Sequence, residues 1–140
     1  MTPEEVAGFL AGQRKVHVAT IGRDGSPHLV PMYFLLVDGA VTFWTYTRSQ
    51  KVRNLRRDPR VTVMAEAGEA YFDLRGVQIA GRAHLSEDAA RVAAFGQRLH
   101  EHHFGAPAET SREMIARQAP KRTLVTVEPV RVVSWDHGRL

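Results

Sequence analysis

Asp38 and Gly39 separate two runs rich in apolar and aromatic residues, 28–37 and 40–46. An Asp-Gly pair between two such runs is typical of a two-residue β-hairpin turn, which joins antiparallel strands. Parallel neighbours need a crossover of a dozen or more residues instead. About six strand patterns occur along the chain at short spacing, with few helices between them. This spacing predicts a mostly β, α+β fold: an antiparallel barrel covered by a few helices.

The other elements are predicted from periodicity and from residues typical of helix ends. Strands are expected over residues 15–21, 28–37, 40–46, 60–67, 71–85 and 122–135, the last of these either one strand broken at Pro129 or two. Helices are expected over residues 3–11, 49–58, 86–104 and 111–119. Thr2 with Glu5, and Thr110 with Glu113, have the spacing of N-terminal capping boxes.

A shift in the apolar pattern interrupts the long run 71–85. Phe72 and Leu74 share one phase of the alternation, whereas Val77 has the opposite phase. A β-bulge produces a one-residue slip of this kind, and glycine tolerates the local bend. We therefore expect a bulge at Arg75 and Gly76.

The composition excludes several classes of protein. The 140 residues match the length of one domain, here residues 1–140. The absence of cysteine excludes disulfides, thiolate metal sites and cysteine nucleophiles. No apolar run approaches the 18 or so residues of a membrane-spanning helix, and the acidic N-terminus lacks the pattern of a secretory signal. These features predict a cytoplasmic protein that does not associate with a membrane.

Residues 48–60 carry six lysine or arginine side chains and a single acidic one, Asp58. A strand delivers the chain to Thr45, and a helix begins near Ser49. The free amides at a helix N-terminus, together with Lys51 and Arg53, favour binding of an anion such as phosphate. The alternative is an amphipathic helix with a solvated cationic face. A nucleic-acid-binding surface is disfavoured because no exposed aromatic residues alternate with these cations.

The seven histidines suggest a metal site only at one point. His100 and His103 lie three residues apart on one face of a predicted helix, where two ligands could meet. No third ligand accompanies them, so a solvated helix end is the better interpretation and no metal is expected. His28 lies on a predicted strand and is a candidate for contact with a substrate.

Four segments carry a resemblance to a known family: ATIGRDGSPH (19–28), VPMYF (30–34), SQKVRNLRRDPRV (49–61) and GVQIAGRA (76–83). Their order resembles the pyridoxamine 5′-phosphate oxidase-like superfamily of homodimeric split β-barrels, which bind flavin or deazaflavin. Within it the chain is similar to short flavin/deazaflavin oxidoreductases of actinobacteria, many of which use coenzyme F420. Pyridoxamine 5′-phosphate oxidases proper have a longer C-terminal segment with substrate-phosphate residues, so oxidation of pyridoxamine phosphate is not expected.

The resemblance implies a set of cofactor-binding positions. The backbone that lines the isoalloxazine or deazaflavin ring is that of Val30, Pro31 and Met32. The ring and ribityl chain are contacted by Trp44 and Thr45. The residues that match the family's phosphate-binding positions are Ser49, Gln50, Lys51 and Asn54, with Arg53 as an auxiliary cation. Gly76 and Val77 match a strand that approaches the cofactor from the partner subunit. Arg122 matches a cation near the F420 tail.

The function implied is an oxidoreductase in which F420 transfers hydride to a small unsaturated or heteroaromatic substrate at the dimer interface. The alternatives are an FMN-dependent enzyme of the same fold, or a non-catalytic protein that binds flavin, F420 or haem. The cofactor then performs the redox chemistry, so no acid–base constellation is required. We expect the substrate pocket beside the ring, lined by Tyr33 and the loop 104–111, with His28 near the cofactor strand.

Overall fold

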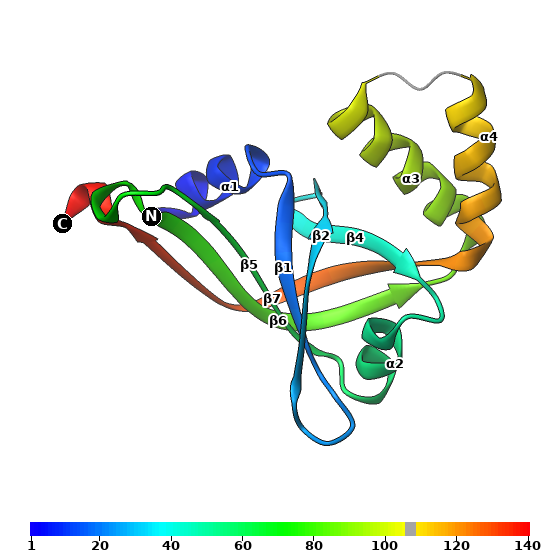
Figure 1. Cartoon of the computed structure of the whole chain (residues 1–140), viewed down its shortest axis with the longest axis horizontal. Coiled ribbons are helices and arrows are strands. Elements are labelled where there is room, and N and C mark those ends of the chain that lie inside the picture. The colour runs from blue at the N-terminus through cyan, green and yellow to red at the C-terminus, as the bar shows by residue number, and fades with distance from the viewer. Residues whose placement is uncertain (106–108) are drawn as a thin grey trace.

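The chain folds into a curled antiparallel sheet with helices at its ends and over one face (Figure 1). The computed structural model describes residues 1–105 and 109–140, without the side chain of Thr110. The strands are β1 (Lys15–Ile21), β2 (Pro27–Tyr33), β3 (Leu35–Val37), β4 (Ala40–Tyr46), β5 (Arg60–Ala67), β6 (Arg75–Ser86) and β7 (Arg122–Asp136). The helices are α1 (Pro3–Ala11), α2 (Gln50–Arg57), α3 (Ala89–Phe104) and α4 (Glu109–Gln118).

The sheet has the strand order β2-β1-β5-β6-β7-β4-β3, and every pairing is antiparallel, as predicted. Its two edge strands, β2 and β3, are consecutive in the sequence and are separated only by Phe34. The sheet must therefore curl until its edges meet at Phe34, whose side chain is buried. The predicted strand 28–37 is divided at this residue, so the described chain has seven strands rather than six.

The hairpin predicted at Asp38 and Gly39 is confirmed. Both residues have positive φ, 51° and 80°, as a type I′ turn requires. The capping box of α1 is also confirmed, because Glu5 N donates to Thr2 Oγ1 and Thr2 N donates to the Glu5 carboxylate. Local residue chemistry therefore determines both the first helix and the central turn.

The prediction of a bulge at Arg75 and Gly76 is wrong. β6 pairs with β5 without interruption from Arg75 to Arg82, and Tyr71–Asp73 forms a 3₁₀ turn that precedes the strand. The change in apolar phase marks the end of that turn and not a slip within a strand.

The irregularity in the sheet lies further along, where β6 meets β7. Ala80 pairs with Arg131 and Gly81 pairs with Pro129, so Val130 is the extra residue, on β7. Pro129 cannot donate a backbone hydrogen bond, which suits a position beside a bulge. β7 nevertheless continues as one strand of 15 residues past Pro129.

Helices α3 and α4 differ slightly from their predicted ends. Asp88 caps α3 by accepting from Arg91 N, so the helix begins at Ala89 and not at residue 86. α4 begins at Glu109, which places Thr110 inside its first turn rather than at the N-cap. Part of the loop 104–111, expected to line a substrate pocket, lies outside the described residues.

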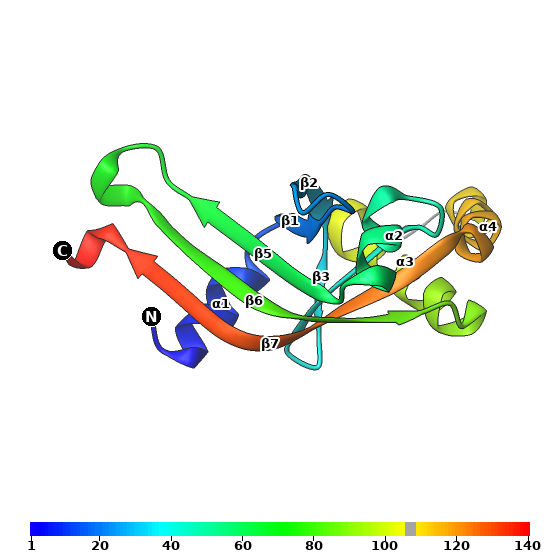
Figure 2. The same cartoon turned by 90° about the horizontal axis from the view of Figure 1, so that it is seen from below.

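The interior of the curled sheet is an apolar core centred on Val16, Val18, Phe43, Val63 and Val125, all of them almost fully buried. A second apolar cluster fills the space between α3 and the outer face of β4 and β7. β5, β6 and β7 extend beyond the barrel, with α1 beside them (Figure 2). The extension leaves much of the outer face of the sheet bare.

Candidate functional site

The start of α2 has the features that the sequence predicted for an anion site. Ser49 caps the helix, and its hydroxyl accepts from Val52 N at 3.3 Å. The backbone amides of the first turn point toward the end of the helix, where they favour negative charge. Lys51 and Gln50 belong to this turn, Lys51 half-buried and Gln50 exposed. Arg53 is exposed one residue further along. The structure therefore keeps these four predicted residues together.

Asn54, expected to contact the phosphate, has a different environment. Its side chain is fully buried, and Nδ2 donates to Thr20 Oγ1 on β1 at 3.0 Å. Its Oδ1 accepts from Gln50 Nε2 at 2.8 Å and from Arg57 at 3.2 Å. These bonds occupy the amide and fasten α2 to the sheet, so Asn54 positions the helix from below. Thr20 was missed in the sequence because nothing local marks its contact with a helix 34 residues away.

Lys51 and Arg122 bring two positive charges together at this end of the sheet. Burial, followed by the charge of Arg122, lowers the pKa of the Lys51 ammonium. Neither residue forms a salt bridge with a carboxylate in the described part of the chain. Two converging cations without a counterion are unfavourable in isolation and become favourable when an anion binds between them.

Arg122 is held in place by aromatic rings. Register between β4 and β7 places it opposite Tyr46. Its guanidinium carbon lies 4.2 Å from the Tyr46 ring centroid and 4.6 Å from that of Trp44, the geometry of cation–π contacts. Its Nε is buried and has no hydrogen-bond partner within the described residues. The guanidinium is thus oriented in advance. Tyr46 was not identified in the sequence, because its role depends on the long-range pairing of β4 with β7.

Trp44 and Thr45, neighbours on β4, point to opposite faces of the sheet. Trp44 is half-buried beside Arg122, on the face that α3 covers. Thr45 is 3% exposed and faces the interior, where a ligand does not reach its side chain. Of the two, only Trp44 therefore adjoins the cation pair.

Val30, Pro31 and Met32 lie on β2, an edge strand of the sheet. An edge strand presents backbone groups without a neighbouring strand to pair with, and these can bond to the polar rim of a planar ligand. The proline, which has no N–H, is compatible with an edge position. His28 lies further along the same strand, opposite Thr20, and its Nδ1 is buried without a described partner.

Gly76 and Val77 lie far from α2 within one chain. They are among the first residues of β6 and pair with the C-terminal end of β7, where Gly76 is opposite Trp135. β6 has 12 residues, so at roughly 3.3 Å per residue its ends are about 35 Å apart. A single copy of the chain therefore does not bring these two residues to the anion site.

A small apolar pocket lies next to Arg122 and Trp44, beneath α3 and α4. We call it the α3 pocket; its volume is about 270 Å³. Its lining residues are Met32, Tyr33, Trp44, Gly96, Leu99, His100, Phe104, Met114, Ile115 and Arg122. Tyr33, expected to contact a substrate, belongs to this pocket, whereas His28 does not. A Cβ atom on Gly96 would overlap the Trp44 ring, so the glycine allows the indole to press against α3.

A cationic groove of about 740 Å³ runs along the other side of α2. It is lined by Arg23, Gln50, Arg53, Arg56 and Arg57. Arg56 pairs with Glu87, and Arg57 donates to the backbone oxygen of Ile21 at 2.7 Å. Arg23 and Arg53 form no ion pair in the described part of the chain. The groove therefore retains free positive charge beside the anion site.

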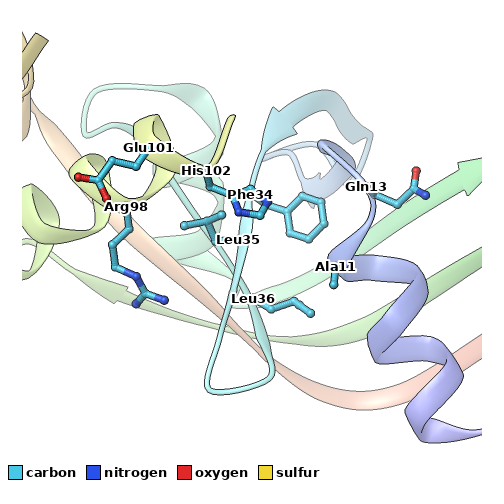
Figure 3. A pocket seen from close by; sticks show the side chains of 8 residues that line it. All are labelled: Ala11, Gln13, Phe34, Leu35, Leu36, Arg98, Glu101 and His102. Atoms are coloured by element: carbon cyan, nitrogen blue, oxygen red, sulfur yellow. The ribbon is translucent and has the colours of Figure 1, made fainter. Parts of the chain in front are cut away.

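The three histidines of α3 have different surroundings, although the His102 and His103 ring centroids are 4.8 Å apart. His103 is buried, and its Nε2 lies 2.9 Å from the backbone oxygen of Phe34, so it joins the helix to the β2–β3 junction. His102 lines a separate cavity of about 440 Å³, together with Phe34, Arg98 and Glu101 (Figure 3). His100 belongs to the α3 pocket. Residues 1–105 and 109–140 contain no cluster of three metal-ligand side chains.

Comparison with known proteins identifies the family of the chain. The family model of pyridoxamine 5′-phosphate oxidase matches residues 2–136. No curated protein matches the chain. Within the described ranges no helix is long and apolar enough to cross a membrane.

Solved structures of similar fold support the family match. The conserved hypothetical protein Rv2991 of Mycobacterium tuberculosis has 37% identity and a TM-score of 0.91, over 98% of this chain and 86% of that one. An F420 reductase has 22% identity and a TM-score of 0.76, over 94% and 98%. The haem storage protein HutZ of Vibrio cholerae has 18% identity and a TM-score of 0.71, over 93% and 92%. At these lower identities the last two establish the fold alone. The chain belongs to the pyridoxamine 5′-phosphate oxidase-like family of split β-barrels.

Proposed function

We propose that the protein is an oxidoreductase that binds coenzyme F420 through the anion site at the start of α2. The observation that carries this proposal is that the Arg122 guanidinium lies over the Tyr46 ring, and the Tyr46 backbone oxygen accepts from the N-cap of α2, Ser49 N, within one turn of Lys51; neither cation forms a salt bridge within the described residues. A phosphate group supplies the missing negative charge and accepts from both residues. Charge-assisted hydrogen bonds of this kind are roughly twice as strong as neutral ones.

The surrounding residues fit the rest of a phosphate-bearing ribityl cofactor. The phosphate meets the Ser49-capped helix end, Lys51 and Arg122, while Asn54 holds the helix in position. The ring system lies along the edge of β2, toward Met32. When bound, the cofactor supplies hydride transfer; the protein supplies orientation and electrostatics. The substrate in this proposal is a small unsaturated or heteroaromatic molecule.

The cationic groove favours F420 over FMN. Both cofactors present the same phosphate to Lys51, so that contact does not discriminate between them. F420 also carries a tail with several carboxylates, and Arg23 and Arg53 provide positive charge that no described acidic residue neutralises. The resemblance assigned Arg122 to the tail; we propose that it contributes to the phosphate grip, because its charge acts on Lys51. FMN remains the alternative cofactor.

We further propose that a second copy of the chain completes the site. The outer face of β2, β1, β5 and β6 is exposed or half-exposed and carries no charged side chain across eight positions: Leu29, Pro31, His17, Ala19, Met64, Thr62, Gln78 and Ala80. Its margin on β7 has Val133 opposite Gln78 and the exposed Arg131 opposite Ala80. An uncharged surface of this extent fits a homodimer interface. Gly76 and Val77 are far from α2 in their own chain, so they reach a cofactor only from the partner. Both residues are buried and the Val77 side chain, 0% exposed, belongs to the core, so this contribution comes from the backbone of the strand.

Titration of the cofactor-free protein with FMN and with F420 tests the proposal. We expect both to bind and F420 to bind at least tenfold more tightly. Lys51→Ala should weaken both by about 1.5–3 kcal/mol, roughly 10- to 150-fold. Lys121→Ala, at an exposed lysine next to Arg122, is the matched control and should change neither affinity. Binding of neither cofactor, or equal losses in the two variants, would contradict the proposed site.

A further inference from the structure

The two edge strands of the sheet differ in how they are protected from a further strand. β2 carries Pro27 and Pro31, which have no N–H to offer to a neighbour. β3 has the sequence Leu-Leu-Val, with no proline and no charged residue. Natural proteins protect their edges with proline, charge or a covering segment, because an unprotected edge pairs readily with another extended chain. Of the two edges, β3 is therefore the one that can accept a further strand.

One residue of β3 directs its backbone toward the open side. The two-residue turn that follows Val37 makes Val37 and Ala40 a hydrogen-bonded pair, so the next pair, Leu36 and Val41, is not hydrogen-bonded. The N–H and C=O of Leu36 thus point away from β4, and neither bonds to a backbone group outside the sheet. Together they can exchange two hydrogen bonds with one residue of an added strand.

A cavity of about 440 Å³ lies along this edge, and we call it the β3 groove (Figure 3). Its volume is within the range of roughly 300–1,000 Å³ that is typical of ligand sites. Three elements supply its walls: β3 with Leu35 and Leu36, the end of α1 with Ala11 and Gln13, and α3 with Arg98 and Glu101. The proposed dimer face consists of other strands, so the proposed dimer does not use this edge.

The charges of α3 give the groove a direction. His103 bonds to the backbone oxygen of Phe34, so the C-terminal part of α3 lies at the start of β3. Glu101 belongs to that part, whereas Arg98, one turn earlier, also lines a neighbouring cavity together with Val37, at the other end of β3. Neither Arg98 nor Glu101 forms a salt bridge in the described part of the chain. The cation therefore lies toward Val37 and the carboxylate toward Phe34.

We propose that the β3 groove binds an extended peptide of a partner protein as an additional strand, antiparallel to β3. The peptide has an acidic, an apolar and a basic residue in succession. Its apolar residue lies opposite Leu36 and exchanges two backbone hydrogen bonds with it. The acidic residue then lies opposite Val37 and the basic residue opposite Leu35, on the face of β3 that packs against α3. There the acidic side chain meets Arg98 and the basic side chain meets Glu101.

The probe is the fluorescently labelled peptide Thr-Glu-Val-Lys-Thr, blocked at both ends, and binding to the full chain is followed by fluorescence anisotropy. Thr-Lys-Val-Glu-Thr has the same composition and should bind about three- to tenfold more weakly, the range expected for two exposed ion pairs. The double variant Arg98→Glu with Glu101→Arg should reverse this order, which a misfolded protein does not do. Arg112→Glu, at an exposed position of α4, is the control and should leave both affinities unchanged.

The backbone contact is tested on the peptide, without any change to the protein. N-methylation of the central valine removes the N–H that donates to the Leu36 oxygen, and it should weaken binding by about tenfold. The N–H of the adjacent lysine points away from β3, because successive residues of a strand alternate in this respect. N-methylation of that lysine is the matched control and should leave binding unchanged.

Three results would overturn the inference: no binding of either peptide, equal affinities of the two peptides, or equal losses from the two N-methylations. A second copy of the chain is the other candidate for this edge. If sedimentation shows a particle larger than a dimer that the peptide does not dissociate, a second copy occupies β3 and the inference is wrong. None of these measurements requires FMN or F420, so their outcome is independent of the proposed function.

Discussion

Lys51, in the first turn of α2, lies within the electrostatic influence of Arg122, the first residue of β7: burial and, after it, the Arg122 charge lower the pKa of the Lys51 ammonium, and neither cation forms a salt bridge within the described residues. A fold gains nothing from such a pair, since like charges repel and a half-buried ammonium loses hydration. The arrangement is typical of a functional site, where stability is sacrificed for binding. Phosphate binding reverses both effects.

The affinity for FMN should fall at alkaline pH because Lys51 loses its proton there. Only the protonated ammonium binds phosphate strongly, so affinity should fall as pH rises through the Lys51 pKa of the free protein, which is below 10.5. The unfolded chain retains this proton up to the ordinary pKa. The cofactor-free fold therefore gains stability as pH rises between the two values. Fluorescence titration from pH 7 to 11 measures the effect. Lys51→Arg, whose guanidinium stays protonated, should remove this fall; the same profile in both proteins would exclude Lys51 as its source.

Two glycine-to-alanine changes should have opposite effects on stability. A Cβ on Gly96 overlaps the Trp44 indole, and we expect Gly96→Ala to destabilise the fold by about 1–3 kcal/mol. Nothing lies within 4 Å of a Cβ on Gly8, in α1, so Gly8→Ala should stabilise it by about 0.4–1 kcal/mol. Urea denaturation of both variants measures the difference. A stable Gly96→Ala protein would show that Trp44 is free to move away from α3.

F420 affinity should fall more steeply with salt than FMN affinity. In the proposed site the tail lies in the exposed groove that Arg53 and Arg23 line, where ions screen charge efficiently. Arg53→Ala should reduce the slope for F420 and leave that for FMN unchanged. Arg122→Ala should weaken both cofactors because its guanidinium serves the shared phosphate. Binding curves between about 50 and 500 mM NaCl test this, and equal slopes for the two cofactors would favour FMN as the natural ligand.

Sedimentation should show a particle of twice the 15.7 kDa chain mass at micromolar concentration. An obligate interface of this kind buries about 2,000 Å² or more. Ala19→Glu places a charge in the middle of the uncharged outer face, between Leu29 and Thr62, and it should produce monomers that bind the cofactor weakly. Ala94→Glu, on an exposed position of α3, should remain dimeric. A wild-type monomer would remove the partner contribution assigned to Gly76 and Val77.

The local parts of the fold were predictable because their signals are local. Asp38 and Gly39 specify their turn through backbone conformation, and Ser49 specifies the start of α2 through its hydroxyl. The interpretation failed where two structures give the same pattern. The shift between Leu74 and Val77 results from the end of a 3₁₀ turn, and the real bulge, at Val130, is indicated only by Pro129.

The candidate site was predictable in its α2 part and not beyond it. Ser49 and Lys51 are close in sequence, so their proximity follows from the helix alone. The electrostatic influence of Arg122 on Lys51 depends on the pairing of β4 with β7, which no short-range pattern encodes. The role of Asn54 could not be separated from ligand binding, because its partner Thr20 is remote along the chain.

The pairing of β4 with the distant strand β7 has a consequence for how the protein folds during synthesis. The hairpins β1–β2 and β3–β4 form from neighbouring residues, but β4 finds its second partner only in β7, as the contact between Thr47 and Thr123, 76 residues apart, illustrates. Loop closure over such a separation is slow. During synthesis the early hairpins therefore lack the second partner of β4, and Trp44 stays uncovered, until the ribosome has made nearly the whole chain. The last strand closes the barrel and, in the same event, brings Arg122 to Lys51, so no partly folded form of the chain has a complete anion site.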